Sequence, residues 1–150
     1  MEIGEKVLSF SAQDQDNNTV ELDKLLKDGP LVIFFYPKAM SPMCTKQSCH
    51  FRDLESEFFA LGATVVGVSG DPEDAQAKFD EKHQLGYRLL SDSEGQIARQ
   101  FDIKRFGPLG VKRSTFVISE SGKLLGKYSS ELRANGHADW ALELLQSSSK

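Results

Sequence analysis

Two short runs of the chain are hydrophobic at nearly every position, and both predict strands buried on both faces of a sheet. The first is "LVIFFY" over residues 31–36, and the second is "TVVGVS" over residues 64–69. Unbroken apolar runs of this length are typical of central strands that helices cover on both sides. The pattern predicts further strands as a hairpin within 9–22, a short strand at 87–92 and a hairpin over 114–129.

The segments between these strands carry the apolar spacing and the end signals of helices. The predicted helices cover residues 22–29, 42–61, 71–86, 93–101 and 136–146. The longest begins at Pro42, ends at Leu61 and is closed by Gly62. Asp71 is expected to cap the next helix, with Pro72 at its first helical position.

This order of elements predicts one α/β domain over residues 1–150. The strand–helix–strand unit around the two apolar runs implies parallel neighbours, and the last hairpin adds antiparallel strands. We therefore expect a mixed central sheet flanked by helices, which is the plan of a thioredoxin-like fold with an N-terminal β-hairpin extension. The tail "SSSK" at 147–150 is expected to be flexible.

The composition is ordinary for a water-soluble globular protein, with 39% hydrophobic and 27% charged residues among 150. The net charge of −4 argues against a nucleic-acid partner, which needs a basic face. The start "MEIGEKVLSF" has no apolar signal core, and no apolar run approaches the roughly 20 residues of a membrane span. We expect a cytoplasmic chain without membrane contact, whose two cysteines are reduced.

Both cysteines lie in one segment, "FYPKAMSPMCTKQSCHFRD" over residues 35–53, at the predicted start of a helix. Ser41 is expected to be the N-cap and Pro42 the first helical residue, so Cys44 falls in the first turn. Unpaired backbone N–H groups and the positive end of the helix dipole stabilise a thiolate there. Because the thiolate is the reactive form of cysteine, Cys44 is a candidate nucleophile.

The helix geometry keeps the two cysteines apart. At about 100° per residue, Cys44 shares a stripe that should face the sheet with four hydrophobic residues, Phe51, Leu54, Phe58 and Leu61. Cys49 lies roughly 140° around the helix, nearer to solvent or under a neighbouring loop. The two Cα atoms are roughly 8.5–9 Å apart, whereas a disulfide needs about 4.4–6.8 Å. A Cys44–Cys49 disulfide therefore requires the first turns of the helix to unwind.

The same segment resembles the active-site motif of peroxiredoxins, Pro-x-x-x-Thr/Ser-x-x-Cys, through Pro37, Ser41 and Cys44. The continuation to the second cysteine and "FRDL" is similar to the peroxiredoxin Q, or bacterioferritin comigratory protein, subgroup. The resemblance covers residues 4–146, through "LGATVVGVSGDPEDAQAKFDEKHQL", "LLSDSEGQIARQFDI", "RSTFVISESGKLLGKY" and "GHADWALELL".

The resemblance implies a thioredoxin-dependent peroxidase that reduces hydrogen peroxide and organic hydroperoxides without a cofactor or a metal. Cys44 would attack the peroxide and become a sulfenic acid, which Cys49 would resolve as an intramolecular disulfide. Ser41 would hydrogen-bond the peroxide, and Pro37 would shield the sulfur from water. Arg113 would position the peroxide and favour the thiolate. Thioredoxin or a similar dithiol protein would then reduce the disulfide, and the enzyme would be a monomer.

Some positions depart from the pattern of many relatives, which read "DDTPGCT" where this chain reads "AMSPMCT". Ser41 keeps the hydroxyl of threonine but lacks the methyl group that restricts its rotamer. Met40 and Met43 make the rim of the pocket more apolar, which predicts a preference for organic hydroperoxides. The segment "IKRFGPLGVKR" at 103–113 is shorter than in many relatives, which predicts a more open loop beside the site.

Each candidate residue taken alone also has an ordinary structural interpretation. Cys44 could be a small core residue, and Ser41 could be only a helix cap. Pro37 could simply end a strand, and Arg113 could be a solvated charge at a strand edge. Two histidines and the tryptophan are interpreted as structural: His83, His137 and Trp140.

Three rival functions remain open. A one-cysteine peroxidase would use an external thiol to resolve Cys44 and leave Cys49 as a bystander. A general thiol–disulfide oxidoreductase is less favoured, because such enzymes usually use a CxxC pair. A metal-binding module is the weakest alternative, because its ligands would be limited to Cys44, Cys49 and the adjacent His50.

Overall fold

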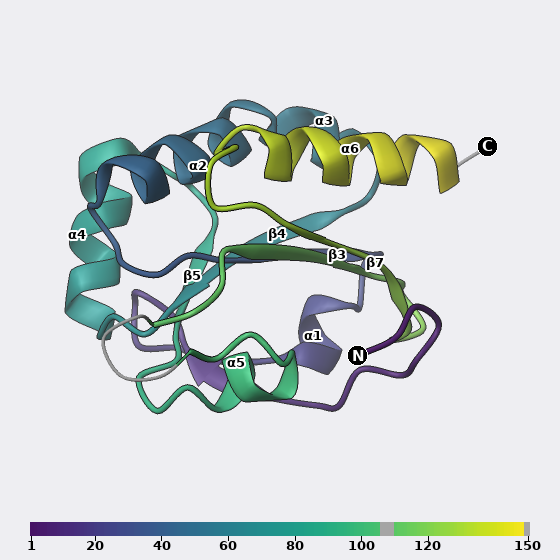
Figure 1. The fold of residues 1–150 in the computed structure, drawn as a ribbon, viewed down its shortest axis with the longest axis horizontal. Helices are drawn as coiled ribbons and strands as arrows, with labels where there is room; N and C mark the ends of the chain where they lie inside the picture. Colours follow the sequence, from purple (N-terminus) through teal and green to yellow (C-terminus); the bar gives the residue numbers. More distant parts are fainter. Residues whose placement is uncertain (106–109, 149–150) are drawn as a thin grey trace.

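A computed structural model describes residues 1–105 and 110–148, and in this part of the chain seven strands form one sheet (Figure 1). The strands are β1 (Ser11–Gln13), β2 (Thr19–Glu21), β3 (Leu31–Phe35), β4 (Thr64–Ser69), β5 (Arg88–Ser91), β6 (Ser114–Ile118) and β7 (Leu124–Ser129). Their order across the sheet is β2-β1-β5-β4-β3-β6-β7. β3, β4 and β5 are parallel, and the remaining pairs are antiparallel, so the predicted mixed sheet with an N-terminal hairpin is confirmed.

Helices cover both faces of this sheet (Figure 1). They are α1 (Leu22–Leu25), α2 (Pro42–Asp53), α3 (Glu55–Ala60), α4 (Glu73–His83), α5 (Gln96–Gln100) and α6 (Gly136–Ser148). Helices α2, α3, α4 and α6 pack on one face, and α1 and α5 pack on the other. The chain is therefore a three-layer α/β structure, which confirms the predicted thioredoxin-like class.

The central strand β3 divides its side chains between two hydrophobic cores, one on each face of the sheet. Val32 and Phe34 point into the core under α2, whereas Ile33 and Phe35 point into the core above α5. All four are fully buried. Burying a side chain of this size stabilises the fold by about 1.5–3 kcal/mol, so the apolar run fixes the start of α2 firmly.

The predicted helix over 42–61 is wrong in one respect, because it is interrupted at Leu54. Leu54 has φ −99° and ψ 5° and separates α2 from α3. Neither glycine nor proline marks the break, and its cause is tertiary. The last turn of α2 is held by other elements, because Phe51 stacks on Phe34 at 4.1 Å and Arg52 donates to the carbonyl of His83 at 2.6 Å. The helical stripe is otherwise as predicted, with Cys44, Phe51 and Phe58 fully buried and with Leu54 and Leu61 half-buried.

The predicted cap of α4 is also wrong. The helix begins at Glu73, and Pro72 takes the N-cap position without a side-chain hydrogen bond. The Asp71 carboxylate turns away from the helix and accepts a hydrogen bond from the backbone N–H of Ala39 instead. At the other end, Gln84 adopts a left-handed conformation with φ 48°, so the helix ends before the predicted residue 86.

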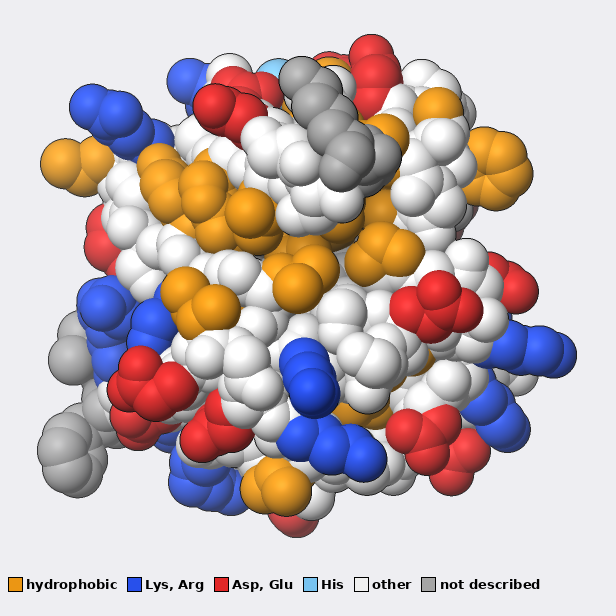
Figure 2. Space-filling view, turned by 90° about the vertical axis from the view of Figure 1, so that its right-hand side faces the viewer, with side chains coloured by type: hydrophobic (Ala, Val, Ile, Leu, Met, Phe, Trp, Pro, Cys, Tyr) orange, Lys and Arg blue, Asp and Glu red, His pale blue; other side chains and the backbone are white. Residues whose placement is uncertain are grey.

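The end of the molecule opposite the first turn of α2 carries a band of hydrophobic side chains, below the C-terminal residues of α6 (Figure 2). On this side of the fold, α6 lies so close to β7 that a Cβ on Gly126 would approach Leu144 within 2.8 Å and Trp140 within 3.0 Å.

No helix in the described ranges combines the length and the hydrophobicity needed to cross a bilayer. Helix α6 itself continues through Ser148, two residues beyond its predicted end at 146.

Candidate active site

Cys44 lies in the first turn of α2, just beyond the carboxyl end of β3. Its side chain is fully buried and packs in the core on the α2 face of the sheet. The loop of residues 37–41 connects the strand to the helix beside it. Ser41 takes the N-cap position with extended backbone angles, and Pro42 follows as the first helical residue. The predicted placement of the cysteine in a helix N-terminus is therefore confirmed.

Ser41 does not cap the helix with its side chain, contrary to the sequence-based expectation. Its hydroxyl donates to the carbonyl of Lys38 at 2.9 Å, while its own carbonyl accepts from the N–H of Thr45 at 2.8 Å. The hydroxyl thus belongs to the loop rather than to the helix. The Ser41 oxygen keeps acceptor capacity, and the side chain is only half-buried.

Arg113 contacts the cysteine directly, although it is far away in the sequence. It precedes β6, is only 5% exposed, and its Nη1 lies 3.2 Å from the Sγ of Cys44. The alternative of a solvated charge at a strand edge is therefore wrong. The same Nη1 donates to Oε1 of Gln47 at 2.6 Å. Gln47 was not among the candidate residues, although its spacing of three from Cys44 on a helix puts both on one face.

Two buried donors beside the sulfur have no hydrogen-bond partner within residues 1–105 and 110–148. They are Nε of Arg113 and Nε2 of Gln47. Buried polar groups of folded proteins are nearly always hydrogen-bonded, and exceptions concentrate where a ligand or water binds. Cys44 therefore lies next to two side chains, Arg113 and Gln47, that each keep one donor without a partner in the described residues.

Pro37 lies at the start of the loop and is half-buried. Gly110, with φ +67°, comes close to it, because a Cβ at that position would lie 3.6 Å from the carbonyl oxygen of Pro37. The segment after Ile103 therefore returns to the active-site loop. The prediction that this segment leaves the loop more open falls largely on residues 106–109, which lie outside the described residues.

Cys49 lies further along α2 and is half-buried, which agrees with its predicted place nearer to solvent. Both cysteines are free thiols. Partial burial raises the pKa of Cys49, although the guanidinium of Arg52 acts in the opposite direction. The neighbouring turn is tied to the sheet, because the hydroxyl of Tyr87 donates to the carbonyl of Ser48 at 2.7 Å.

The third ligand of the metal-binding alternative is engaged elsewhere. A ring nitrogen of His50 lies 2.7 Å from a carboxylate oxygen of Asp139 on α6. Over the ranges 1–105 and 110–148, no three His, Cys, Asp or Glu side chains form a group that could hold a metal ion. The geometry of this part of the chain therefore gives that alternative no support.

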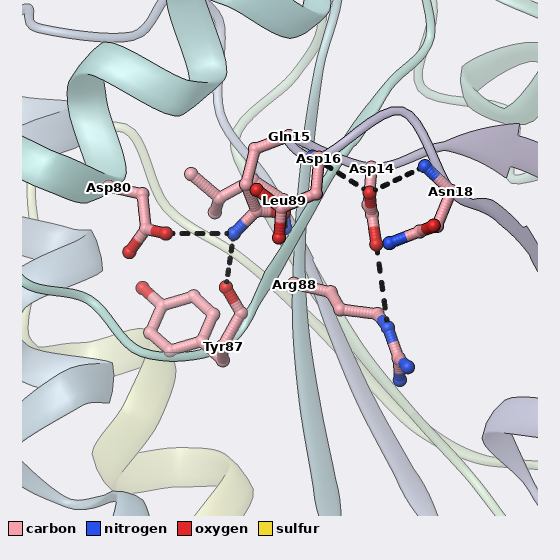
Figure 3. Close-up of polar contacts among 8 residues, drawn as sticks. All are labelled: Asp14, Gln15, Asp16, Asn18, Asp80, Tyr87, Arg88 and Leu89. Atoms are coloured by element: carbon pink, nitrogen blue, oxygen red, sulfur yellow. Dashed lines mark hydrogen bonds and ion pairs between the residues drawn. The ribbon is translucent and has the colours of Figure 1, made fainter.

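A cavity of 490 Å³ lies away from the cysteines, between the β1–β2 hairpin and the turn that leads into β5. Gln15 lines it, and its side chain reaches from the hairpin to the segment of residues 87–89 (Figure 3). Its amide nitrogen donates to Asp80 at 3.1 Å and to the carbonyl of Tyr87 at 2.9 Å, and its oxygen accepts from the N–H of Leu89 at 2.9 Å. Within the described residues the cavity lining includes neither cysteine, and the hydrogen bonds of Gln15 hold the hairpin against this edge of the fold.

Comparisons with known proteins assign the chain to a family. The sequence profile of the AhpC/TSA family matches residues 3–126, so the chain belongs to that family. Peroxiredoxin Bcp of Bacillus subtilis is 36% identical over an alignment of 156 positions, which covers all of this chain and 98% of that protein. These matches make the chain a peroxiredoxin, and therefore a thiol peroxidase.

Solved structures place it further within the family. The crystal structure of peroxidoxin BcpB from Mycobacterium tuberculosis matches with a TM-score of 0.94 and 47% identity, over 98% of this chain and 97% of that one. The bacterioferritin comigratory protein of Xanthomonas campestris matches with a TM-score of 0.86 and 28% identity, over 94% and 92%. The resemblance to the peroxiredoxin Q and bacterioferritin comigratory protein subgroup is confirmed.

Proposed function

We propose that this peroxiredoxin reduces hydrogen peroxide and organic hydroperoxides with Cys44 as its nucleophile. The observation that supports this most strongly is the contact of 3.2 Å between Nη1 of Arg113 and the Cys44 sulfur in the first turn of α2. A fixed positive charge at this place stabilises an anionic sulfur before the reaction. It also stabilises the negative charge that develops on the departing oxygen.

The first step is a displacement at oxygen. The Cys44 thiolate attacks one peroxide oxygen, so an S–O bond forms while the O–O bond breaks. The other oxygen leaves as hydroxide or alkoxide and takes up a proton to become water or an alcohol. Cys44 is oxidised to a sulfenic acid. Ser41 would hydrogen-bond the peroxide, and Pro37 would shield the sulfur from water.

The second step joins the two cysteines. The Cys49 thiolate attacks the Cys44 sulfur, so an S–S bond forms, the S–O bond breaks, and the hydroxide leaves as water after protonation. Cys44 is fully buried and Cys49 is half-buried on another face of α2. The helix therefore has to unwind locally before the sulfurs can meet.

A dithiol protein of the thioredoxin type would supply the two electrons that return the disulfide to two thiols. This cycle suits a reducing compartment such as the cytoplasm, where thiols stay reduced between turnovers. Because both sulfurs come from one helix, the cycle needs no second copy of the chain, and a monomer is sufficient. Light scattering on the reduced protein tests this oligomeric state.

A coupled assay tests the proposal. Oxidation of NADPH by thioredoxin reductase, thioredoxin and peroxide is followed for the wild type, Cys44→Ser and Cys49→Ser. We expect Cys44→Ser to be inactive with either peroxide. We expect Cys49→Ser to reduce one equivalent of peroxide and then to stall with thioredoxin as the reductant. Normal turnover by Cys44→Ser would refute the assignment of the nucleophile.

Mass spectrometry separates this cycle from the one-cysteine alternative. After one equivalent of peroxide, the two-cysteine cycle leaves an intramolecular Cys44–Cys49 disulfide. A lasting sulfenic acid on Cys44, with Cys49 still a free thiol, would instead support an external resolving thiol.

The substrate preference is proposed from the rim of the site. Met40 is 42% exposed and Met43 is half-buried, so both present apolar surface near the entrance. The Xanthomonas relative is described in connection with alkyl peroxide reduction. We expect a higher kcat/KM for cumene hydroperoxide than for hydrogen peroxide, and a smaller ratio in Met40→Gln. Equal values for the two peroxides in the wild type would contradict this preference.

A further inference from the structure

The carboxylate of Asp71 is tied to the loop that carries the proposed peroxide-binding residues. One of its oxygens, Oδ2, accepts from the backbone N–H of Ala39 at 2.7 Å. The same oxygen accepts from the hydroxyl of Ser69 at 2.7 Å, and the Asp71 N–H donates back to the Ser69 oxygen at 3.2 Å. Asp71 thus connects the end of β4 to the loop of residues 37–41 across a separation of 32 residues.

This contact is the outer end of a hydrogen-bonded network that begins in the core. The amide nitrogen of Gln76 donates to the Ser69 oxygen at 3.0 Å and to the carbonyl of Leu90 at 2.9 Å. The hydroxyl of Tyr36 donates to the Gln76 oxygen at 2.5 Å. Tyr36, Ser69 and Gln76 are all buried. Burial raises the pKa of Tyr36, so its hydroxyl remains a donor at any pH at which the enzyme works.

The network holds the loop at two points. Tyr36 directly precedes Pro37, and Ala39 lies in the middle of the loop. Between Ala39 and Ser41, Met40 adopts φ +70°, in the left-handed region that a non-glycine residue occupies only when its surroundings require it. The hydrogen bond from the adjacent Ala39 N–H to Asp71 holds the backbone immediately before this residue.

We propose that Asp71 is a positioning residue for peroxide reduction. It acts through the Ala39 N–H, which fixes the loop so that Pro37 and Ser41 face Cys44. Ser69, backed by Gln76, sets the orientation of its carboxylate. This inference rests on the proposed function, because it concerns the rate at which Cys44 reacts with peroxide.

The experiment measures the reaction of Cys44 with peroxide in the Cys49→Ser background, where Cys44 is the single remaining thiol. We expect Asp71→Ala to lower the second-order rate constant between about tenfold and about a hundredfold, because a small misplacement of reacting groups costs this much. Asp71→Asn should restore most of the rate, since its amide oxygen can accept both hydrogen bonds. Asp71→Glu keeps the charge but moves the oxygens, and it should remain slow.

The matched control is Asp74→Ala, which removes an exposed carboxylate from the first turn of α4 and should leave the rate unchanged. Alkylation of Cys44 by iodoacetamide, which needs no bound peroxide, separates positioning from a general structural effect. The alkylation rate should be the same in the parent, Asp71→Ala and Asp71→Asn. Equal slowing of alkylation and peroxide reduction, or no rescue by asparagine, would overturn the positioning role.

A double-variant comparison tests the direction of the network. If Ser69 acts through Asp71, Ser69→Ala should slow the peroxide reaction by itself but should add nothing to Asp71→Ala. Independent, multiplied effects would overturn this part of the proposal. Wild-type rates in Asp71→Ala, with Cys44→Ser inactive, would refute the inference alone, whereas activity in Cys44→Ser would refute the proposed function first.

Discussion

Arg113 is a buried cation whose nearest side-chain partners are a sulfur and an amide oxygen. In the described part of the chain, its guanidinium forms no ion pair with a carboxylate. The nearby Glu131 carboxylate instead accepts a hydrogen bond from the backbone N–H of Arg113. A buried charge is costly unless a charge of opposite sign compensates it. A thiolate on Cys44 would provide that compensation. This contact is the reason why we propose that Arg113 favours the thiolate of Cys44 during the reaction.

Arg113→Lys tests the geometry of this pair while it keeps the charge. A lysine presents a point charge on a flexible stem in place of the planar guanidinium, whose Nη1 contacts both Cys44 and Gln47. We expect the rate of peroxide reduction to fall about 100-fold, the cost of removing one aligned donor from a reacting oxyanion. Stopped-flow measurement of Cys44 oxidation checks this result, with the exposed Arg133→Lys as the control. A lysine variant as fast as the wild type would show that charge alone is sufficient.

Gly29 is a residue whose replacement should damage the fold at a distance from the site. It has φ +145°, and a Cβ there would overlap the carbonyl oxygen of Gly62. We expect Gly29→Ala to lower the free energy of unfolding by about 2–4 kcal/mol, because backbone must move. Gly122→Ala is the matched control, since its φ is +89° with nothing within 4 Å. Equal losses in urea denaturation of both variants would show that the close approach to Gly62 is unimportant.

Local sequence patterns relate candidate site residues only where these are neighbours in the chain. Pro37, Ser41 and Cys44 follow one another through a strand end, a loop and a helix start. The contact of Arg113 with the sulfur joins residues 69 positions apart; local reasoning favoured a solvated arginine, and only the family resemblance assigned Arg113 to the site. Asp71 had a plausible local role as a helix cap. Its hydrogen bond to the Ala39 N–H joins residues 32 positions apart, so local sequence patterns could not predict it.

Among the elements, strands were predicted more accurately than helix ends. β3 and β4 agree with their apolar runs within one residue, because full burial on both faces leaves no other arrangement for them. The break at Leu54 was missed, since helix propensity continues through it and contacts with other elements decide it. The result is a short α2 that ends soon after Cys49.

The anchor of α2 to Tyr87 should control how readily the helix opens. Tyr87→Phe removes the hydrogen bond to the Ser48 carbonyl, which contributes about 1 kcal/mol and thus about a fivefold change in the opening equilibrium. We expect faster hydrogen exchange of the α2 amides in the reduced protein. We also expect faster formation of the Cys44–Cys49 disulfide after a pulse of peroxide. Tyr128→Phe removes a hydroxyl from β7 and serves as the control; identical exchange in both variants would contradict the anchoring role.

For the molecule as a whole, His137 links α6 to the sheet. It is fully buried, with one ring nitrogen 2.8 Å from the Thr115 hydroxyl and the other 2.8 Å from the Ser130 carbonyl. The carbonyl can only accept, so that nitrogen carries a proton; in the neutral ring the other nitrogen accepts from Thr115. Burial and the nearby Arg113 lower the pKa of His137, while the Ser130 carbonyl and Glu131 oppose the shift. Burial thus favours the neutral form of His137, and the hydrogen bonds of its two ring nitrogens agree with its predicted structural role.

This lowered pKa makes the stability of the protein depend on pH. Below pH 6.5, His137 binds a proton more readily in the unfolded chain than in the folded protein. The contribution of His137 to the free energy of unfolding is therefore fully present above pH 6.5 and is lost as the pH falls below it. The slope from one such group is at most about 1.4 kcal/mol per pH unit. Urea denaturation from about pH 8 to about pH 5 should show this loss in the wild type and a smaller one in His137→Gln. The control is His83→Gln, and an unchanged slope in His137→Gln would contradict the assignment.

Most residues of the proposed catalytic cycle lie in one continuous stretch of thirteen residues, from Pro37 to Cys49. Arg113 and the positioning residue Asp71 are the proposed groups outside this stretch. The stretch follows a strand that is buried in both cores, so its starting point is fixed by the scaffold. Its exposed positions, such as Met40, are where a substitution can change the peroxide preference with the least effect on packing. Because it is continuous, the segment is a compact unit for grafting onto a related scaffold. Such a scaffold needs an arginine at the position of Arg113 and an aspartate at the position of Asp71.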